Sequence, residues 1–303
     1  MKRYSSYIDV HHHYNPLSML NLPKNIRQKI LKEEGGSMDI SRNLDAMEKL
    51  GIEKSILSYP AWFPALTEQE SLVFCTQVNE CYANLISEHS CLGAFALLPV
   101  SRNHELVLGA MEYALDTLQL EGIVLPTGMQ GVTLCSQTCF NLFQELNNRN
   151  GTIFFHPSFS RPDNEKVRKT DYEVMTEVTK ITCELVFNKI PRKFPHIRFI
   201  LPYGGGNTSF FFQDAEQSMD AEKELELDEI FKRLYYDTVF PNRTNLLGCL
   251  ERFADKSHIL FGSDFPSASL LFVQERMAEL EQIQYKNGQT LASYTRQNAF
   301  FVR

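Results

Sequence analysis

The chain has 303 residues, with 30 lysines and arginines against 37 aspartates and glutamates, which gives a formal net charge of −7. Hydrophobic residues make up 43% of it and charged residues 22%, a composition that excludes intrinsic disorder. The acidic balance without a basic stripe argues against nucleic acid as a partner, and no apolar stretch reaches the ~18 residues of a membrane span.

Short apolar runs alternate with longer amphipathic segments along the whole chain. The predicted strands are Tyr7–His11, Lys54–Tyr59, Gly93–Pro99, Gly122–Leu125, Thr152–His156, Ile197–Pro202, Tyr235–Val239 and Ile259–Gly262. The predicted helices are Ser41–Gly51, Leu72–His89, Glu105–Gln119, Ser136–Asn148, Tyr172–Asn188 and Leu246–Phe253. Such alternation is typical of a (β/α)8 barrel. We therefore predict an α/β fold, a distorted TIM barrel that forms a single domain over residues 1–303.

The competing fold is a doubly wound open sheet. That fold favours a G-x-G-x-x-G turn after its first strand, whereas positions 11–16 here read His-His-His-Tyr-Asn-Pro. Three intervals after strands are longer than a barrel requires, namely 17–40, 157–171 and 207–230. We expect lid-like loops there, at the carboxyl ends of the strands. The first should include a short helix at Ile26–Glu34, and the acidic third is also typical of a solvated helix face.

The first predicted strand ends in Asp-Val-His-His-His at positions 9–13. Side chains alternate along a strand, so Asp9, His11 and His13 should share one face and His12 the other. Two imidazoles two residues apart can hold one metal ion at the end of a barrel strand. By itself, the pattern is also typical of a histidine-rich surface segment.

Two other strands end in residues with metal-binding side chains. The fifth ends at His156, directly before Pro157, and the eighth is followed by Asp264 in Gly-Ser-Asp-Phe-Pro. Taken alone, His156 is equally well explained as a structural histidine. Asp264, taken alone, is equally well explained as the N-cap of the next helix.

The three signals together are stronger than each one apart, because the ends of the first, fifth and eighth strands face one mouth of a barrel. They form a set of three nitrogens and one oxygen that suits Zn²⁺, or alternatively Mn²⁺, with a position left for water. Such an ion lowers the pKa of bound water toward ~7 and polarises carbonyl or carboxylate oxygens. The four candidate metal ligands are His11, His13, His156 and Asp264.

The chain also carries an ordered series of short motifs. They are Asp-x-His-x-His at 9–13, His-Pro at 156–157, Gly-Gly-Gly at 204–206, Tyr-Asp-Thr at 236–238, Phe-Gly-Ser-Asp-Phe-Pro at 261–266 and Asn-Ala at 298–299. The series resembles the amidohydrolase superfamily, in the branch of aminocarboxymuconate-semialdehyde decarboxylase and the amidohydrolase 2 proteins. The resemblance spans nearly the whole chain. It implies a TIM barrel with one divalent metal, usually zinc, on the four ligands named above.

The resemblance also indicates a reaction class. Members decarboxylate aromatic or unsaturated carboxylic acids, or hydrolyse lactones and similar esters. Other branches hold two metals bridged by a carbamylated lysine on the fourth strand. Residues 122–127 read Gly-Ile-Val-Leu-Pro-Thr, without a lysine, which favours one metal.

One position departs from the family pattern. Tyr203 stands before the three glycines, where the family usually has a histidine that acts as acid or base. A tyrosine can donate a hydrogen bond, but with a reference pKa of ~10 it is a poor base at neutral pH. We expect Tyr203 to serve as a donor and Asp264 to orient the metal-bound water. The alternatives are different chemistry and a loss of catalysis.

Candidate substrate contacts lie in loops at the same mouth. Trp62 and Phe63 follow the second strand and can form an apolar wall over a ring. Arg161 and Arg243 follow the fifth and seventh strands and can each bind a carboxylate through two hydrogen bonds. Tyr14 directly follows the metal histidines and is expected to line the pocket. For each residue the alternative is a packing or surface role.

The sequence thus predicts a mononuclear metal-dependent decarboxylase or hydrolase of a small, cyclic or unsaturated carboxylic acid. The alternatives are a lactone hydrolase that uses metal-bound hydroxide and a non-catalytic, metal-bearing barrel that binds a carboxylate. The resemblance further implies a homodimer.

Cysteine usage and the amino terminus indicate the compartment. The seven cysteines are odd in number and form no C-x-x-C pair, which predicts free thiols in a reducing compartment. The basic residues at positions 2–3 precede no apolar segment, so we expect no signal peptide and a cytoplasmic protein.

Overall fold

The computed structural model describes residues 7–33, 38–60, 66–127, 134–157, 171–208, 221–239, 250, 253–284 and 288–299. Within these ranges, eight parallel strands follow one another around one sheet in chain order. The strands are β1 (Tyr7–His13), β2 (Ile52–Ser58), β3 (Leu92–Leu97), β4 (Gly122–Pro126), β5 (Thr152–His156), β6 (Arg198–Leu201), β7 (Tyr235–Asp237) and β8 (Ile259–Leu260). Every predicted strand is present, with small shifts at its ends.

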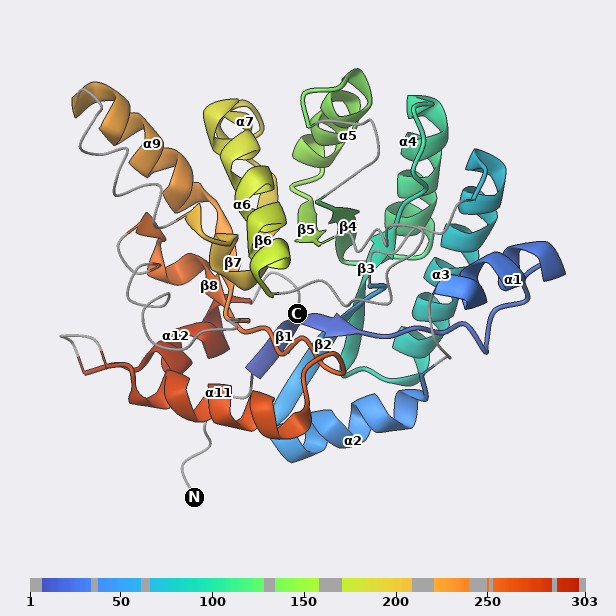
Figure 1. Cartoon of the computed structure of the whole chain (residues 1–303), viewed down its shortest axis with the longest axis horizontal. Coiled ribbons are helices and arrows are strands. Elements are labelled where there is room, and N and C mark those ends of the chain that lie inside the picture. Colours follow the sequence, from blue (N-terminus) through green and yellow to red (C-terminus); the bar gives the residue numbers. More distant parts are fainter. Residues whose placement is uncertain are drawn as a thin grey trace.

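The helices lie around the outside of the strands (Figure 1). They are α1 (Lys24–Glu33), α2 (Ile40–Leu50), α3 (Glu68–Glu88), α4 (His104–Glu112), α5 (Gln137–Asn148), α6 (Asp171–Phe187), α7 (Ile190–Lys193), α9 (Ala221–Arg233), α11 (Leu270–Gln282) and α12 (Leu291–Asn298). Shorter turns are the π-helical η1 (Tyr113–Thr117) and the 3-10 turns η2 (Pro202–Gly205) and η3 (Lys256–His258). Most of the predicted helix Leu246–Phe253 lies outside the described residues.

The sheet closes because β1 is hydrogen-bonded on both sides. One side pairs with β2, and the other meets the segment that follows β8. There the amide of Asp264 donates to the His11 carbonyl at 2.8 Å, and the amide of His13 donates to the Phe265 carbonyl at 2.7 Å. We call this contact between β1 and the segment after β8 the seam. The predicted TIM barrel is confirmed.

The continuous apolar runs of the strands reflect burial on both faces. Every residue of β3 and of β5 is buried, as expected where one strand face lines the barrel interior and the other packs against helices. The largest fully buried side chains are aromatic: Tyr14, Tyr59, Tyr82, Tyr236, Phe74, Phe95, Phe143, Phe154, Phe155, Phe194 and Phe199. The packed interior gives the mouth of the barrel a rigid base.

Local signals account for the ends of α2 and α3, the helices that follow β1 and β2. Asp39 caps α2 by accepting a hydrogen bond from the Ser41 amide, and Gly51 ends it in a left-handed conformation with φ 67°. Thr67 and Glu70 form a capping box at the start of α3. The lengths of these helices are thus set by sequence-local hydrogen bonds.

Helices are seen in the described parts of the first and third long intervals. Interval 17–40 contains α1, close to the predicted short helix. The acidic interval 207–230 is not a loop throughout, because α9 begins at Ala221; its charged residues are typical of a solvated helix face. Residues 158–170 and 209–220 lie outside the described ranges, so the lid role of these intervals stays a prediction.

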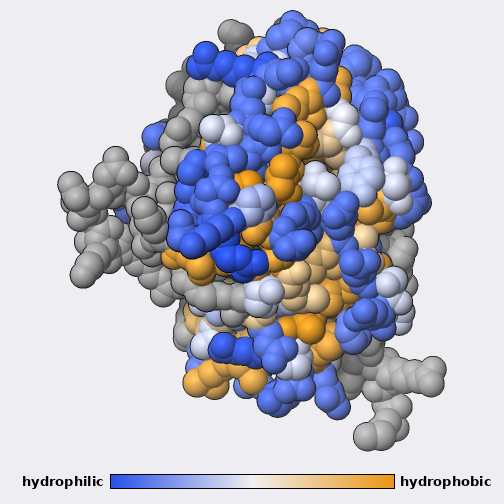
Figure 2. All heavy atoms as spheres, turned by 90° about the vertical axis from the view of Figure 1, so that its right-hand side faces the viewer, coloured by the Kyte–Doolittle hydropathy of each residue, from blue (hydrophilic) through white to orange (hydrophobic). Residues whose placement is uncertain are grey.

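The face that carries α1 is mostly hydrophilic, with apolar side chains in a broken band (Figure 2). Among the described residues, the large apolar side chains that are exposed come from separate elements: Met19, Leu31, Tyr113, Phe140, Phe187, Leu225 and Leu271. None of the described helices is long and apolar enough to cross a membrane.

Candidate metal centre at the mouth of the barrel

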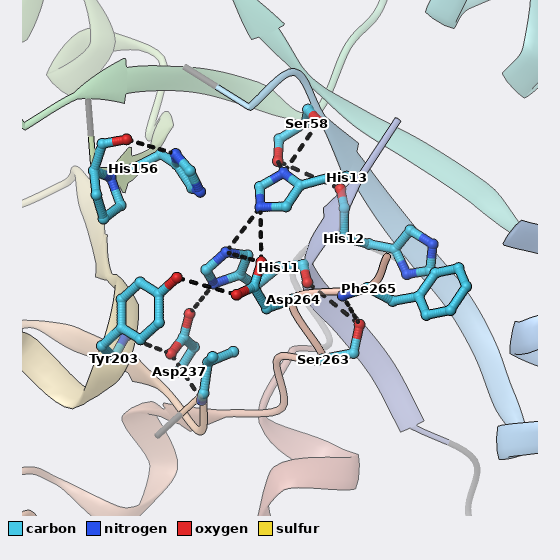
Figure 3. A network of polar contacts seen from close by, with 12 residues as sticks. His11, His12, His13, Ser58, His156, Tyr203, Asp237, Ser263, Asp264 and Phe265 are labelled. Carbon is cyan, nitrogen blue, oxygen red and sulfur yellow. Dashed lines mark hydrogen bonds and ion pairs between the residues drawn. The ribbon is translucent and has the colours of Figure 1, made fainter. Parts of the chain in front are cut away.

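Three histidines converge where β1 and β5 end. One ring nitrogen of each lies within 4.8 Å of the others, and all three residues are buried. The Nε2 atoms of His11 and His13 are only 3.1 Å apart, and the rings of His13 and His156 meet edge to face (Figure 3). The histidines that the sequence predicts as ligands are therefore brought together.

Each of the three imidazoles is held at its other nitrogen by an oxygen. Nδ1 of His11 lies 2.6 Å from Asp237 Oδ2, and Nδ1 of His156 lies 3.0 Å from the Pro157 carbonyl. Nδ1 of His13 lies 3.1 Å from Ser58 Oγ, whose own hydrogen is directed to the His12 carbonyl. Each Nδ1 therefore donates, which leaves the Nε2 lone pairs free to face the centre.

The surroundings set the charge of these rings. Burial lowers the pKa of His13, and burial together with the neighbouring imidazoles lowers that of His156 well below its usual value. Burial also lowers the pKa of His11, but the Asp237 carboxylate outweighs it and the net direction is upward. His13 and His156 are thus favoured in the neutral form that binds metals.

Asp264 is the predicted oxygen ligand. Its Oδ1 lies 3.2 Å from His13 Nε2 and 3.6 Å from His11 Nε2. Burial raises the pKa of Asp264, but the contact with His13 and the other nearby imidazoles outweighs it, and the net direction is downward. The N-cap of the next described helix, α11, is Ser269, so Asp264 is not that cap.

Tyr203 lies beside Asp264, at the start of the glycine turn that follows β6. Its hydroxyl donates to Asp264 Oδ2 at 3.1 Å, and its ring meets the His11 ring at 85° (Figure 3). The backbone of Tyr203 is left-handed, with φ 52° and ψ 37°. Such a conformation is uncommon for a residue with a large side chain, and strain of this kind clusters at functional sites.

His12 points away from the centre, as strand alternation predicts. Its Nδ1 lies 2.9 Å from Asp9 Oδ2, and its Nε2 lies 2.9 Å from Asn43 Nδ2 of α2. The prediction that Asp9 shares a face with His11 and His13 is wrong, because its carboxylate pairs with His12. The register of β1 is irregular between Asp9 and His12, and such an irregularity redirects side chains.

The predicted substrate residues are not brought to the centre by any described contact. Trp62, Phe63, Arg161 and Arg243 lie outside the described residues. The ring of Tyr14 is buried and its hydroxyl donates to Met19 Sδ at 3.2 Å. These contacts give Tyr14 a packing role.

Sequence reasoning assigned no role to Asp237 and Ser58. Both end strands, β7 and β2, and both are buried against a ligand histidine. Asp237 belongs to the Tyr-Asp-Thr motif, and its position at the end of the seventh strand was the available signal. Ser58 had none, because a serine at a strand end is common.

The donor set fits a divalent metal ion. One ring nitrogen from each of the three histidines lies in one cluster, an Asp264 oxygen lies beside two of them, and each imidazole has an oxygen partner behind it. This is the usual arrangement around zinc and other borderline metals in proteins. The site can therefore hold a cation beside a single oriented hydroxyl, that of Tyr203.

No family model matches the chain. Among curated proteins, it is 25% identical to the 6-methylsalicylic acid decarboxylase acuB of Aspergillus aculeatus, over 90% of each chain. It is 25% identical to the 6-methylsalicylic acid decarboxylase of Penicillium expansum, over 86% of this chain and 85% of that one. It is 27% identical to the decarboxylase macB of Penicillium terrestre, over 93% of this chain and 90% of that protein.

Solved structures share the fold over nearly the whole chain. An amidohydrolase II structure superposes with a TM-score of 0.79 at 21% identity, covering 97% of this chain and 98% of that one. A 2,6-dihydroxybenzoate decarboxylase in complex with 2,6-dihydroxybenzoate gives 0.72 at 15% identity, covering 98% of both. A dihydroxybenzoic acid decarboxylase from Polaromonas with bound manganese gives 0.74 at 13% identity, covering 98% and 97%.

Proposed function

We propose that this chain, a member of the amidohydrolase superfamily, is a metal-dependent decarboxylase of an aromatic carboxylic acid. The observation that carries the proposal is the cluster of three histidine nitrogens, with an Asp264 oxygen beside His13 and the Tyr203 hydroxyl donating to that carboxylate. Relatives that match most of the chain are decarboxylases, which favours decarboxylation over the alternative of lactone hydrolysis.

Four side chains would hold the metal: His11, His13 and His156 through Nε2, and Asp264 through Oδ1. When bound, a divalent ion would polarise a carboxylate or phenolic oxygen of the substrate. Zinc suits the nitrogen-rich set, and manganese is the alternative because a structural neighbour contains it. We therefore assign one Zn²⁺ or Mn²⁺ per chain.

The reaction replaces a carboxylate by a proton. A proton from solvent water binds the ring carbon that carries the carboxylate. The bond from that carbon to the carboxyl carbon then breaks, its electron pair restores the aromatic ring, and carbon dioxide leaves. Asp264 has two tasks in this scheme, because Oδ1 faces the ligand histidines while Oδ2 accepts from Tyr203. The Tyr203 hydroxyl has one hydrogen, which it donates to Asp264 Oδ2 in this structure. When a substrate binds, the hydroxyl would turn that hydrogen to a substrate oxygen and so orient the substrate.

A benzoate with a hydroxyl group beside the carboxylate is the proposed substrate class. Both 6-methylsalicylic acid and 2,6-dihydroxybenzoate, named with relatives or neighbours, have that arrangement. Such a hydroxyl group donates electrons to the ring and eases protonation of the carbon that loses carbon dioxide. Trp62 and Phe63 as an apolar wall, and Arg161 and Arg243 as carboxylate contacts, remain predictions for this substrate.

Carbon dioxide release tests the proposal. Metal-loaded protein would be incubated with a panel of 2-hydroxybenzoates and a panel of lactones, and the products identified. The expected result is carbon dioxide with the matching phenol. Ring-opened product from a lactone would instead identify a hydrolase, and no turnover in either panel would identify a binding protein.

We further propose that the protein works in a reducing compartment such as the cytoplasm. The described cysteines carry free thiols: Cys75, Cys81, Cys91, Cys135, Cys139 and Cys183. Free thiols are typical of compartments kept reduced by glutathione and thioredoxin.

A further inference from the structure

We propose that Asp237 is a positioning residue that holds a metal-binding histidine and the turn of Tyr203 in one fixed arrangement. The inference deepens the proposed function, and its catalytic consequence rests on that function. The positioning role itself is argued from the contacts of Asp237 and does not depend on the proposed reaction.

Asp237 ends β7 and its side chain is fully buried. Its Oδ2 lies 2.6 Å from His11 Nδ1. Its Oδ1 accepts hydrogen bonds from the amides of Tyr203 at 2.8 Å and Val239 at 3.0 Å. The two oxygens therefore serve different partners, one a metal ligand and the other the backbone of the site.

The contact with His11 selects one ring nitrogen for the metal. A carboxylate can only accept, so the hydrogen of the neutral His11 ring lies on Nδ1, and the lone pair of Nε2 is left facing His13. Among the three ligand histidines, His13 and His156 are held by the neutral oxygens of Ser58 and Pro157. A charged partner behind a ligand histidine fixes its orientation and raises its basicity.

The contact with Tyr203 holds a strained turn. Tyr203 and the three glycines after it all have positive φ, which glycine tolerates and tyrosine does not. The far side of the turn is held by α6, where Thr179 Oγ1 accepts a hydrogen bond from the Asn207 amide at 2.7 Å. Asp237 binds the amide at its first residue, so the turn is fixed at both ends.

The contacts form a closed circuit around the centre (Figure 3). Asp237 joins His11, and His11 Nε2 lies 3.6 Å from Asp264 Oδ1. Asp264 Oδ2 accepts from the Tyr203 hydroxyl, and the Tyr203 amide returns to Asp237. A change at Asp237 should therefore reach both the ligand histidine and Tyr203, because its carboxylate contacts His11 Nδ1 and the Tyr203 amide.

The test is Asp237→Asn, measured first without substrate. The asparagine oxygen can still accept from both amides, so its NH2 group should face His11 and donate to Nδ1. The His11 hydrogen would then move to Nε2, in the place of the metal. We expect a roughly 10- to 100-fold weaker Zn²⁺ affinity in chelator competition, with the melting temperature of the metal-free protein little changed.

Asp9→Asn is the matched control. Asp9 is also a buried carboxylate that pairs with a histidine of β1, but its partner His12 points away from the centre. This variant should keep the Zn²⁺ affinity of the wild type. Equal affinities in Asp237→Asn and Asp9→Asn would overturn the proposal.

A second measurement needs no variant. In zinc-loaded wild-type protein, nitrogen-15 spectra of the histidines should show His11 with hydrogen on Nδ1 and metal on Nε2. Metal on Nδ1 of His11 would contradict the assigned role even if Asp237→Asn failed to fold. Because both readouts are independent of turnover, they separate a failure of this inference from a failure of the proposed decarboxylation.

Discussion

Tyr203 departs from the pattern of the family that the sequence resembles. A phenol replaces the imidazole that the family pattern leads one to expect, and it reaches Asp264 rather than standing free. A neutral hydroxyl can orient a substrate and donate to it, but it cannot serve as a base near pH 7. The reaction we propose needs such a donor.

Tyr203→Phe removes that hydroxyl and keeps the ring. We expect a loss of turnover of about 10- to 1,000-fold, because one oriented donor is lost. Metal content by elemental analysis should not change, since the tyrosine oxygen contacts Asp264 Oδ2 and not a histidine. Wild-type turnover in this variant would mean that Tyr203 is structural.

His13 and His12 are adjacent in the sequence but point in opposite directions, so substitutions at the two positions test the metal site against a matched control. His13→Ala removes an Nε2 from the centre and should strongly lower the metal bound per chain. His12→Ala removes a ring that pairs with Asp9 and Asn43, and the metal content should stay at one. If His12→Ala alone lost the metal, the assigned strand faces would be reversed.

At the scale of elements, the glycine turn after β6 depends on its contact with α6. A Cβ at Gly206 would lie 2.6 Å from both the Met175 carbonyl and Thr179 Oγ1, at φ +72°. We expect Gly206→Ala to lower the free energy of unfolding by about 2 kcal/mol or more, measured by denaturant titration.

Gly109→Ala is the control for that variant. Gly109 lies inside α4, and a Cβ there meets nothing within 4 Å. Alanine is the better helix former, so this variant should be more stable by roughly 0.5–1 kcal/mol. Similar destabilisation in both variants would show that the turn does not specifically require glycine at position 206.

The start of α3 makes a pH-dependent contribution to the stability of the folded protein. Hydrogen bonds from Lys29 and the Thr67 amide lower the pKa of Glu70 from 4.5 to about 2. A lowered folded-state pKa stabilises the protein above pH 4.5, and this stability is lost as the pH falls through about 2.

Glu70→Gln tests this linkage, since glutamine retains an oxygen for the capping box but no charge for Lys29. The wild type should be the more stable protein at pH 6, and the difference in unfolding free energy should vanish between pH 4.5 and 2. A difference that is independent of pH would contradict the linkage.

Most of the candidate site could be predicted because its residues lie at the ends of predicted strands. His11, His13, His156 and Asp264 each follow or end an apolar run, and parallel strands in a barrel bring such positions to one mouth. The pairing of Asp237 with His11 spans 226 residues and depends on the neighbourhood of β7, β8 and β1, which a local pattern does not show. The irregular register of β1, which directs Asp9 to His12, has no signal in the sequence either.

At the scale of the whole molecule, we propose a homodimer, as the family resemblance implies. Exposed apolar side chains such as Phe187, Leu225 and Leu271 are available on the outer helices, and association would remove part of that surface from water. Sedimentation at micromolar concentration should give twice the mass of one chain. A species with the mass of a single chain at that concentration would rule the dimer out.

The seam has a consequence for how the protein acquires its metal during synthesis. His11 and His13 leave the ribosome early, whereas Asp264 is among the last parts of the barrel to emerge. The amide of Asp264 donates to the His11 carbonyl, so the proposed fourth ligand arrives with the same hydrogen bonds that join the two ends of the barrel. A nascent chain that ends before the eighth strand has at most an incomplete set of ligands. Full metal affinity would then appear only when the barrel is complete, and metal uptake would report the final step of folding.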